Sequence, residues 1–256
     1  MKNLRLLLLP LLFSHLIHAD DNYLASLGVS IKSEILNDKY CQRTKYNKVL
    51  CMEYQLEYPT TITSKSTELN QYIKKAVQSY RDNFKIGNAK QFILEGQSED
   101  EFDISGSWDN ITTIELFATT SKTFTLRIID GGYTGGAHPN YTTLFKNYSV
   151  TTGKELKDKD LFVPNYKKKL TNIAKDYYKK LHQLTPDKSL TTLGWFDNKF
   201  VLAETFAITE KGLYFLYNSY EIKPYSDGQT TFMLPYEIFT PLISEKSIIS
   251  RLFLGY

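Results

Sequence analysis

Apolar side chains recur at steps of three and four residues in two stretches of the chain, at about 67–84 and 166–184. This period places them on one side of an α-helix, so each stretch predicts an amphipathic helix. Ser66 and Asn165 precede the two stretches as candidate N-caps, and Pro186 follows the second. The predicted apolar stripes are Leu69, Tyr72, Ile73, Ala76, Val77, Tyr80 and Phe84, and Leu170, Ile173, Ala174, Tyr177, Leu181 and Leu184.

The outer side of the second predicted helix is rich in lysine. A solvated helix face explains this pattern, and a patch for an anionic polymer is the alternative. The lysines concerned are Lys167, Lys168, Lys169, Lys175, Lys179 and Lys180.

Most of the remaining chain shows the alternation of apolar and polar side chains that is typical of β-strands. Strands are predicted at 29–36, 49–58, 111–119, 123–129, 141–150, 200–208, 213–217 and 230–234. Turn residues separate them, for example Asp227 and Gly228. Runs of strands interrupted by single helices predict an α+β fold, with antiparallel sheets and the two main amphipathic helices packed on them.

The N-terminus has the pattern of a secretory signal peptide at residues 1–19. Lys2 and Arg5 precede an apolar core, and Ala19 is the small residue before the expected cleavage site. No cysteine lies near this site, so no lipobox is expected, and no later segment is apolar enough to span a bilayer. We therefore expect a periplasmic or secreted protein without a stable membrane span in the mature form.

Charge gives little indication of a nucleic-acid partner. Loss of Lys2 and Arg5 with the signal peptide lowers the formal net charge from +3 to +1. A nearly neutral protein is not expected to bind nucleic acid or an anionic membrane by general attraction. The acidic stretch 95–103 is predicted to be a surface loop.

The two cysteines, Cys41 and Cys51, predict a disulfide. An even pair at short spacing in an exported protein favours a structural bond, and the spacing differs from that of a redox-active Cys-X-X-Cys motif. Met52 and Leu56 alternate with Cys51 and Glu53 along the predicted strand. Cys51 is therefore expected on the less buried face, reaching across a hairpin to Cys41.

The most informative segment is residues 131–139, Gly-Gly-Tyr-Thr-Gly-Gly-Ala-His-Pro. Four glycines in six residues permit a close backbone approach or positive φ angles. This suits a tight bulged hairpin as well as a ligand-binding loop. Within it, His138 is either a structural residue bonded to its own loop or a contact or base at a site.

We find no catalytic constellation, metal site or cofactor motif. No Lys-Ser/Thr follows the glycines as in a phosphate-binding loop, and no G-x-S-x-G elbow occurs. After loss of the signal peptide only His138 and His182 remain, so no zinc site is expected. The acidic pairs Asp100/Glu101 and Asp158/Asp160 lie in charge-rich loops, without an apolar setting that would raise a pKa.

Three motifs resemble a known family of bacterial envelope proteins. They are the Gly-Gly-Ala-His of 135–138, the T-G-K-x-L-x-x-x-D-L-F pattern of 152–162 and the Y-E-I-x-P-Y pattern of 220–225. Together they resemble the extracellular domain of the RsiV anti-sigma factor and the non-catalytic region of PdaC-type deacetylases. The resemblance runs from about residue 46 to the C-terminus and marks residues 20–256 as one RsiV-like α+β region. A possible sub-boundary near 95–108 would divide it into parts 20–95 and 108–256.

The resemblance implies an envelope binding module without catalytic activity, with lysozyme or peptidoglycan as the expected partner. We recognise no anti-sigma segment, transmembrane helix or deacetylase domain in the sequence, so we do not expect signalling through the membrane or deacetylation. The candidate contact residues are Tyr133, His138, Tyr141, Tyr220 and Tyr225, because aromatic and histidine side chains give a large contact area at low entropic cost. The alternatives are scaffold residues that join two hairpins, a cell-wall-modifying enzyme that uses His138, and a structural periplasmic protein.

Overall fold

The computed structural model describes residues 30–43, 47–63, 67–95 and 106–253. The predicted signal peptide, the candidate cap Ser66 and most of the acidic stretch 95–103 lie outside these residues, as does much of the predicted sub-boundary near 95–108. In the described part no helix is long and apolar enough to cross a membrane.

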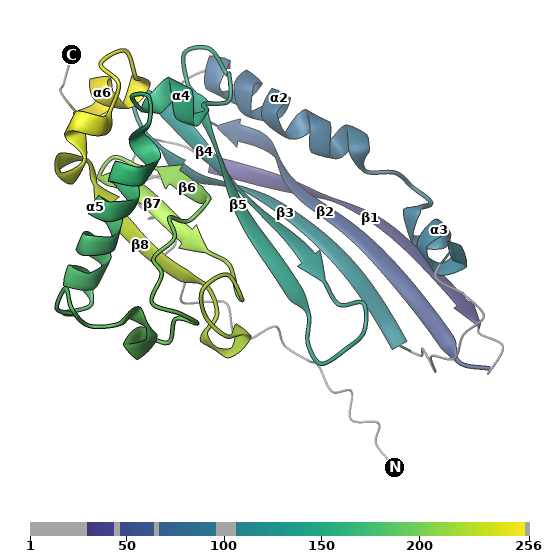
Figure 1. Ribbon diagram of the computed structural model, residues 1–256. Helices are drawn as coiled ribbons and strands as arrows, with labels where there is room; N and C mark the ends of the chain where they lie inside the picture. The colour runs from purple at the N-terminus through teal and green to yellow at the C-terminus, as the bar shows by residue number, and fades with distance from the viewer. Residues whose placement is uncertain (1–29, 44–46, 64–66, 96–105, 254–256) are drawn as a thin grey trace.

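The fold is α+β, as predicted, and has two sheets (Figure 1). The larger sheet has the order β1-β2-β3-β4-β5, and the smaller one the order β6-β7-β8. The strands are β1 (Ser30–Arg43), β2 (Val49–Thr63), β3 (Gly106–Thr119), β4 (Thr123–Gly132), β5 (Asn140–Ser149), β6 (Thr205–Ile208), β7 (Gly212–Tyr217) and β8 (Thr230–Pro235).

One strand pair departs from the predicted antiparallel arrangement. β2 and β3 run parallel, whereas every other neighbouring pair is antiparallel. Two helices lie between them in the chain, α2 (Thr67–Asn83) and α3 (Asn88–Glu95). Such a crossover returns the chain to the starting end of the sheet, and a parallel strand is the consequence.

Helices cover one face of the larger sheet. Ile73 and Val77 of α2 pack on Leu56, Phe124 and other residues of β2–β5, while α3 inserts Ala89 and Ile93 against the other end of β2. The carboxylate of Asp38 on β1 accepts hydrogen bonds from the backbone of Gly87 (3.0 Å) and Ala89 (2.8 Å). The first turn of α3 is thereby capped from a distant strand.

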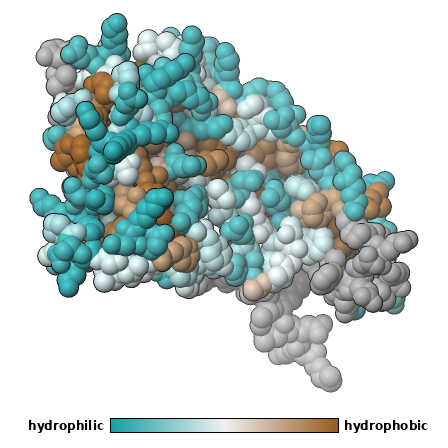
Figure 2. All heavy atoms as spheres, in the orientation of Figure 1, coloured by the Kyte–Doolittle hydropathy of each residue, from teal (hydrophilic) through white to brown (hydrophobic). Residues whose placement is uncertain are grey.

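The helix α5 (Tyr166–Leu181) covers the smaller sheet with Leu170, Ala174 and Tyr178. Figure 2 shows hydrophilic side chains on the outer sides of the helices and hydrophobic atoms beneath them. Two predictions for this helix were wrong. Asn165 adopts a left-handed conformation and does not cap the helix with its side chain. Lys179 is buried, and its ammonium donates to the carbonyls of Pro186 (2.8 Å) and Lys188 (2.6 Å).

The short elements are less visible in the sequence pattern. They are α4 (Asp158–Leu161), η1 (Leu190–Leu193), η2 (Tyr225–Asp227), η3 (Tyr236–Ile238), η4 (Thr240–Leu242) and α6 (Ile248–Phe253). The strand predicted at 200–208 begins only at Thr205, because Phe200 and Ala203 pack into the core from a non-strand segment.

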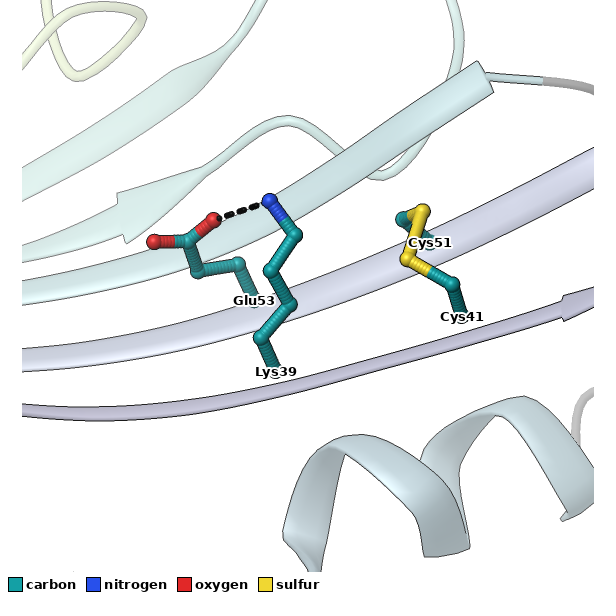
Figure 3. The surroundings of a disulfide bond; sticks show 4 residues. All are labelled: Lys39, Cys41, Cys51 and Glu53. Atoms are coloured by element: carbon teal, nitrogen blue, oxygen red, sulfur yellow. Dashed lines mark hydrogen bonds and ion pairs between the residues drawn. A yellow bond between two sulfur atoms is a disulfide. The ribbon is translucent and has the colours of Figure 1, made fainter.

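The predicted disulfide between Cys41 and Cys51 is present and joins opposed residues of β1 and β2. It lies on the side of the sheet that α3 does not cover, beside the ion pair of Lys39 and Glu53 at 3.0 Å (Figure 3). Cys51 and Glu53 are half-buried, whereas Met52 between them is fully buried under α3. The alternation along this strand confirms the prediction of a less buried face.

Candidate functional site

The glycine-rich segment is the connection between β4 and β5. Gly131 pairs with Tyr141, and Gly132 pairs with Asn140, so the first two glycines are strand residues. A Cβ atom on Gly132 would lie 2.1 Å from the backbone oxygen of Asp109 on β3. This position therefore requires glycine for a close backbone approach. Gly135 and Gly136 are exposed turn residues with positive φ angles.

Three of the predicted contact residues form what we call the aromatic cluster, namely His138, Tyr220 and Tyr225. The rings of His138 and Tyr225 stack with centroids 3.7 Å apart and planes at 13°. The Tyr220 ring lies 5.5 Å from Tyr225 and 6.3 Å from His138. Tyr220 is 54% exposed, and the other two are half-buried. The cluster thus joins the β4–β5 connection to the β7–β8 connection and presents one tyrosine to solvent.

Hydrogen bonds indicate which nitrogen of the His138 ring carries the hydrogen. His138 Nδ1 lies 2.9 Å from the Pro139 carbonyl, which can only accept, so Nδ1 carries the hydrogen. In the neutral ring Nε2 is then an acceptor, and the Tyr220 hydroxyl at 3.3 Å donates to it. The Tyr225 hydroxyl donates to the same Pro139 carbonyl at 2.8 Å. His138 is therefore bonded to its own loop through Nδ1, as one of the two interpretations predicted, whereas Nε2 bonds to Tyr220 of another segment.

Tyr133 and Tyr141 flank the cluster without stacking in it. The Tyr133 hydroxyl donates to the Gly136 carbonyl at 2.9 Å and closes the loop on itself. Its backbone N–H donates to the Asp109 carboxylate at 3.2 Å. Burial raises the pKa of Tyr141, and electrostatic interactions with Asp109 and Tyr225 add to the effect. All five predicted residues thus lie in one region, with Asp109 beside them.

Tyr220 has an unusual backbone conformation. Its φ angle is 69°, a left-handed value that is rare for a bulky residue. Its N–H donates to the Lys223 carbonyl at 3.1 Å, which closes a tight turn. A strained residue that keeps an exposed aromatic side chain is typical of a functional position.

A buried amide network holds this turn in place. The Asn218 side chain accepts from the backbone N–H of Thr143 at 2.7 Å and donates to its carbonyl at 3.1 Å. Gln229 donates to both residues, at 2.8 Å to the Thr143 hydroxyl and at 3.1 Å to Asn218. Sequence reasoning missed Asn218 and Gln229, because nothing along the chain indicates that a polar residue after β7 bonds to the backbone of β5.

The other candidates for chemistry have structural roles. Asp158 accepts a hydrogen bond from the Tyr166 hydroxyl, and Asp160 accepts from the backbone N–H of Lys157 at 2.8 Å. His182 ends α5, far along the chain from His138, and burial together with the charge of Lys223 lowers its pKa. Asp100 and Glu101 lie outside the described residues. Within the described ranges no three His, Cys, Asp or Glu side chains form a group that could hold a metal ion.

Two family models match separate segments of the chain. Residues 46–141 match the model described as "Deacetylase PdaC", and residues 159–237 match "Protein of unknown function (DUF3298)". Tyr133, His138 and Tyr141 belong to the first segment, and Tyr220 and Tyr225 to the second. The aromatic cluster is therefore assembled from both matched segments.

Solved structures share the fold over most of the chain. A DUF3298 family member from Bacteroides fragilis has a TM-score of 0.62 and 20% identity, and the match covers 88% of this chain and 98% of that one. A DUF3298 family protein from Pseudomonas aeruginosa has a TM-score of 0.56 and 16% identity, with 85% and 96% covered. None of the curated proteins matches this chain.

Proposed function

We propose that this protein is an exported module of the cell envelope that binds a ligand at the aromatic cluster and does not catalyse a reaction. The observation that carries the proposal is the exposed, conformationally strained Tyr220, which is held against His138 by contacts between the two matched segments. The export signal predicted at residues 1–19 and the resemblance to RsiV-like domains support the proposed location at the envelope.

The composition of the surface favours a protein ligand, and lysozyme is the candidate that we propose. Tyrosine, glycine and asparagine are enriched in protein-binding loops because they combine contact area with adaptable hydrogen bonding. Six of the ten residues of segment 131–140 are of these types, and two further tyrosines of the cluster lie beside it. Peptidoglycan is the competing ligand and is included in the test.

The hydrogen bonds of His138 support binding over catalysis. Both ring nitrogens already have partners within the protein, at the Pro139 carbonyl and the Tyr220 hydroxyl. A general base needs a free nitrogen within reach of the substrate proton. Use of His138 as a base would require Tyr220 to move away.

The proposal is tested by calorimetry of the mature, oxidised chain with lysozyme and, separately, with sized peptidoglycan fragments. We expect lysozyme to bind with a Kd of about 1 μM or lower, equivalent to about −8 kcal/mol. Tyr220→Ala should weaken binding at least about a hundredfold, the loss expected of a central tyrosine. Leu181→Ala serves as the control, because Leu181 is similarly exposed, at 50%, but lies on α5.

Three results would contradict this assignment. Binding to peptidoglycan fragments alone would replace the proposed ligand, and binding to neither would remove the function. Cleavage or deacetylation of muropeptides that is lost in His138→Ala, with or without added zinc, would show an enzyme instead.

A further inference from the structure

Among the residues that the structure describes, no element covers part of one face of the larger sheet. Side chains on β1–β5 alternate between the face under α2 and α3 and the opposite face, which the smaller sheet covers only at one end through Phe117, Phe145 and their neighbours. We call the remainder the uncovered face. It carries Glu53, Glu57, Asp109, Ile111, Ile129 and Tyr141.

The uncovered face has an apolar centre. Ile111 and Ile129 are half-buried, and neither belongs to the packed cores of the described residues. In the register of the sheet Ile111 pairs with Gly131, and Gly131 pairs with Tyr141. Gly131 contributes no side chain, so the apolar centre continues toward Tyr141 and the aromatic cluster. Apolar side chains grouped on an exposed surface are typical of a binding site.

Carboxylates outnumber cations around this centre. Glu53 is paired with Lys39 and Glu115 with Arg127, whereas Glu57 and Asp109 have no cation within ion-pairing distance among the described residues. Asp109 lies next to Glu53 across the parallel β2–β3 pair, and Glu57 borders the row of Thr113 and Ile129. An apolar centre with a charged rim is the arrangement of protein–protein interfaces.

We propose that the uncovered face is a docking surface for a globular protein that presents basic side chains around an apolar patch, and that this partner also contacts the aromatic cluster. The inference rests on the proposed function and names the chemistry of the partner. Charge complementarity selects it, because a second copy of this chain would bring the same carboxylates together. Peptidoglycan, whose peptides carry carboxylates, would meet the same repulsion.

The test uses lysozyme as the probe and measures association and dissociation rates with the mature, oxidised chain. Glu57→Lys should slow association at least about tenfold and reduce the dependence of the rate on salt, as expected for a rim charge. Ile129→Ser should raise the Kd at least about tenfold, mainly through faster dissociation. The control is Glu237→Lys, because Glu237 is an exposed carboxylate of η3, which directly follows β8 of the smaller sheet. Circular dichroism and Tm establish that each variant is folded.

The outcomes separate this inference from the proposed function. If lysozyme binds, Tyr220→Ala abolishes binding, and both Glu57→Lys and Ile129→Ser retain the original rates, the uncovered face is not an interface and the inference is overturned while the function stands. If Glu237→Lys slows association as much as Glu57→Lys, only net charge matters, and the inference is again overturned. If lysozyme does not bind the unmodified chain, the inference and the proposed function fail together.

Discussion

At the scale of single residues, Tyr220 is the position at which the proposed binding role and a scaffold role can be told apart. Its ring is the most exposed of the aromatic cluster, and its φ angle of 69° is unfavourable for a bulky side chain. A left-handed backbone costs a residue other than glycine about 1–2 kcal/mol. A position with a purely structural role would be expected to carry a residue that adopts this backbone conformation without strain. The strain at Tyr220 therefore favours a role in binding.

Replacement by glycine tests this distinction. Tyr220→Gly relieves the strain of about 1–2 kcal/mol and adds about 0.4–1 kcal/mol of unfolded-state entropy. We therefore expect the free energy of unfolding in urea to stay unchanged or to rise by up to about 1.6 kcal/mol, while lysozyme binding is lost. Tyr225→Ala is the comparison, because it removes the stacked ring and the bond to Pro139 and should lower stability. A loss of stability in Tyr220→Gly larger than that in Tyr225→Ala would identify Tyr220 as scaffold.

At the scale of elements, Asn218 links β5 of the larger sheet to the turn that carries Tyr220. Its amide bonds reciprocally with the backbone of Thr143 and replaces a strand pairing between the two sheets. The link is buried, so its polar atoms depend on one another for partners. Asn218 therefore helps to position the aromatic cluster, together with Gln229 and the Tyr225–Pro139 hydrogen bond.

Removal of the link should cost stability as well as binding. Asn218→Ala leaves the N–H of Thr143 buried without its partner, which should lower the free energy of unfolding by about 2–3 kcal/mol. Thr142→Ala, at the exposed neighbouring position, should change it by less than about 0.5 kcal/mol. Urea denaturation followed by circular dichroism measures both. Equal stability of the two variants would show that the link contributes nothing.

Much of the arrangement of helices and strands could be predicted from the sequence. Periodicity located α2 and α5, alternation located most strands, and the spacing of Cys41 and Cys51 predicted the disulfide. The five aromatic and histidine candidates do lie together. The helix α3 was missed because it is short and is capped by Asp38 from a strand about fifty residues earlier. The buried role of Lys179 was missed because its acceptors are backbone carbonyls, which leave no trace in side-chain patterns.

At the scale of the whole molecule, the core is rich in buried tyrosines. Burial is the main cause that raises the pKa of five of them above the ordinary value of 10.0. They are Tyr58, Tyr148, Tyr178, Tyr217 and Tyr236. These tyrosines pack in the cores of both sheets, so ionisation of their hydroxyls opposes the folding of either sheet.

This distribution predicts unfolding in base. Above about pH 10 the unfolded chain loses the phenolic protons first, while the folded chain keeps them. The unfolded state then binds fewer protons, so stability falls as the pH rises. Tyrosinate absorbance should therefore rise in two phases, exposed tyrosines first and buried ones together with the loss of circular dichroism. A single phase near pH 10 that is complete before unfolding would contradict the burial of these hydroxyls.

The most direct test of the central claim is hydrogen exchange of the mature, oxidised chain with and without saturating lysozyme. The aromatic cluster joins two connections that are about eighty residues apart in the chain, so binding there should slow exchange in both. We predict protection at residues 133–141 and 218–226, and little change on α5. Unchanged exchange in both segments, or protection confined to α5, would contradict the assignment of the cluster as the binding site.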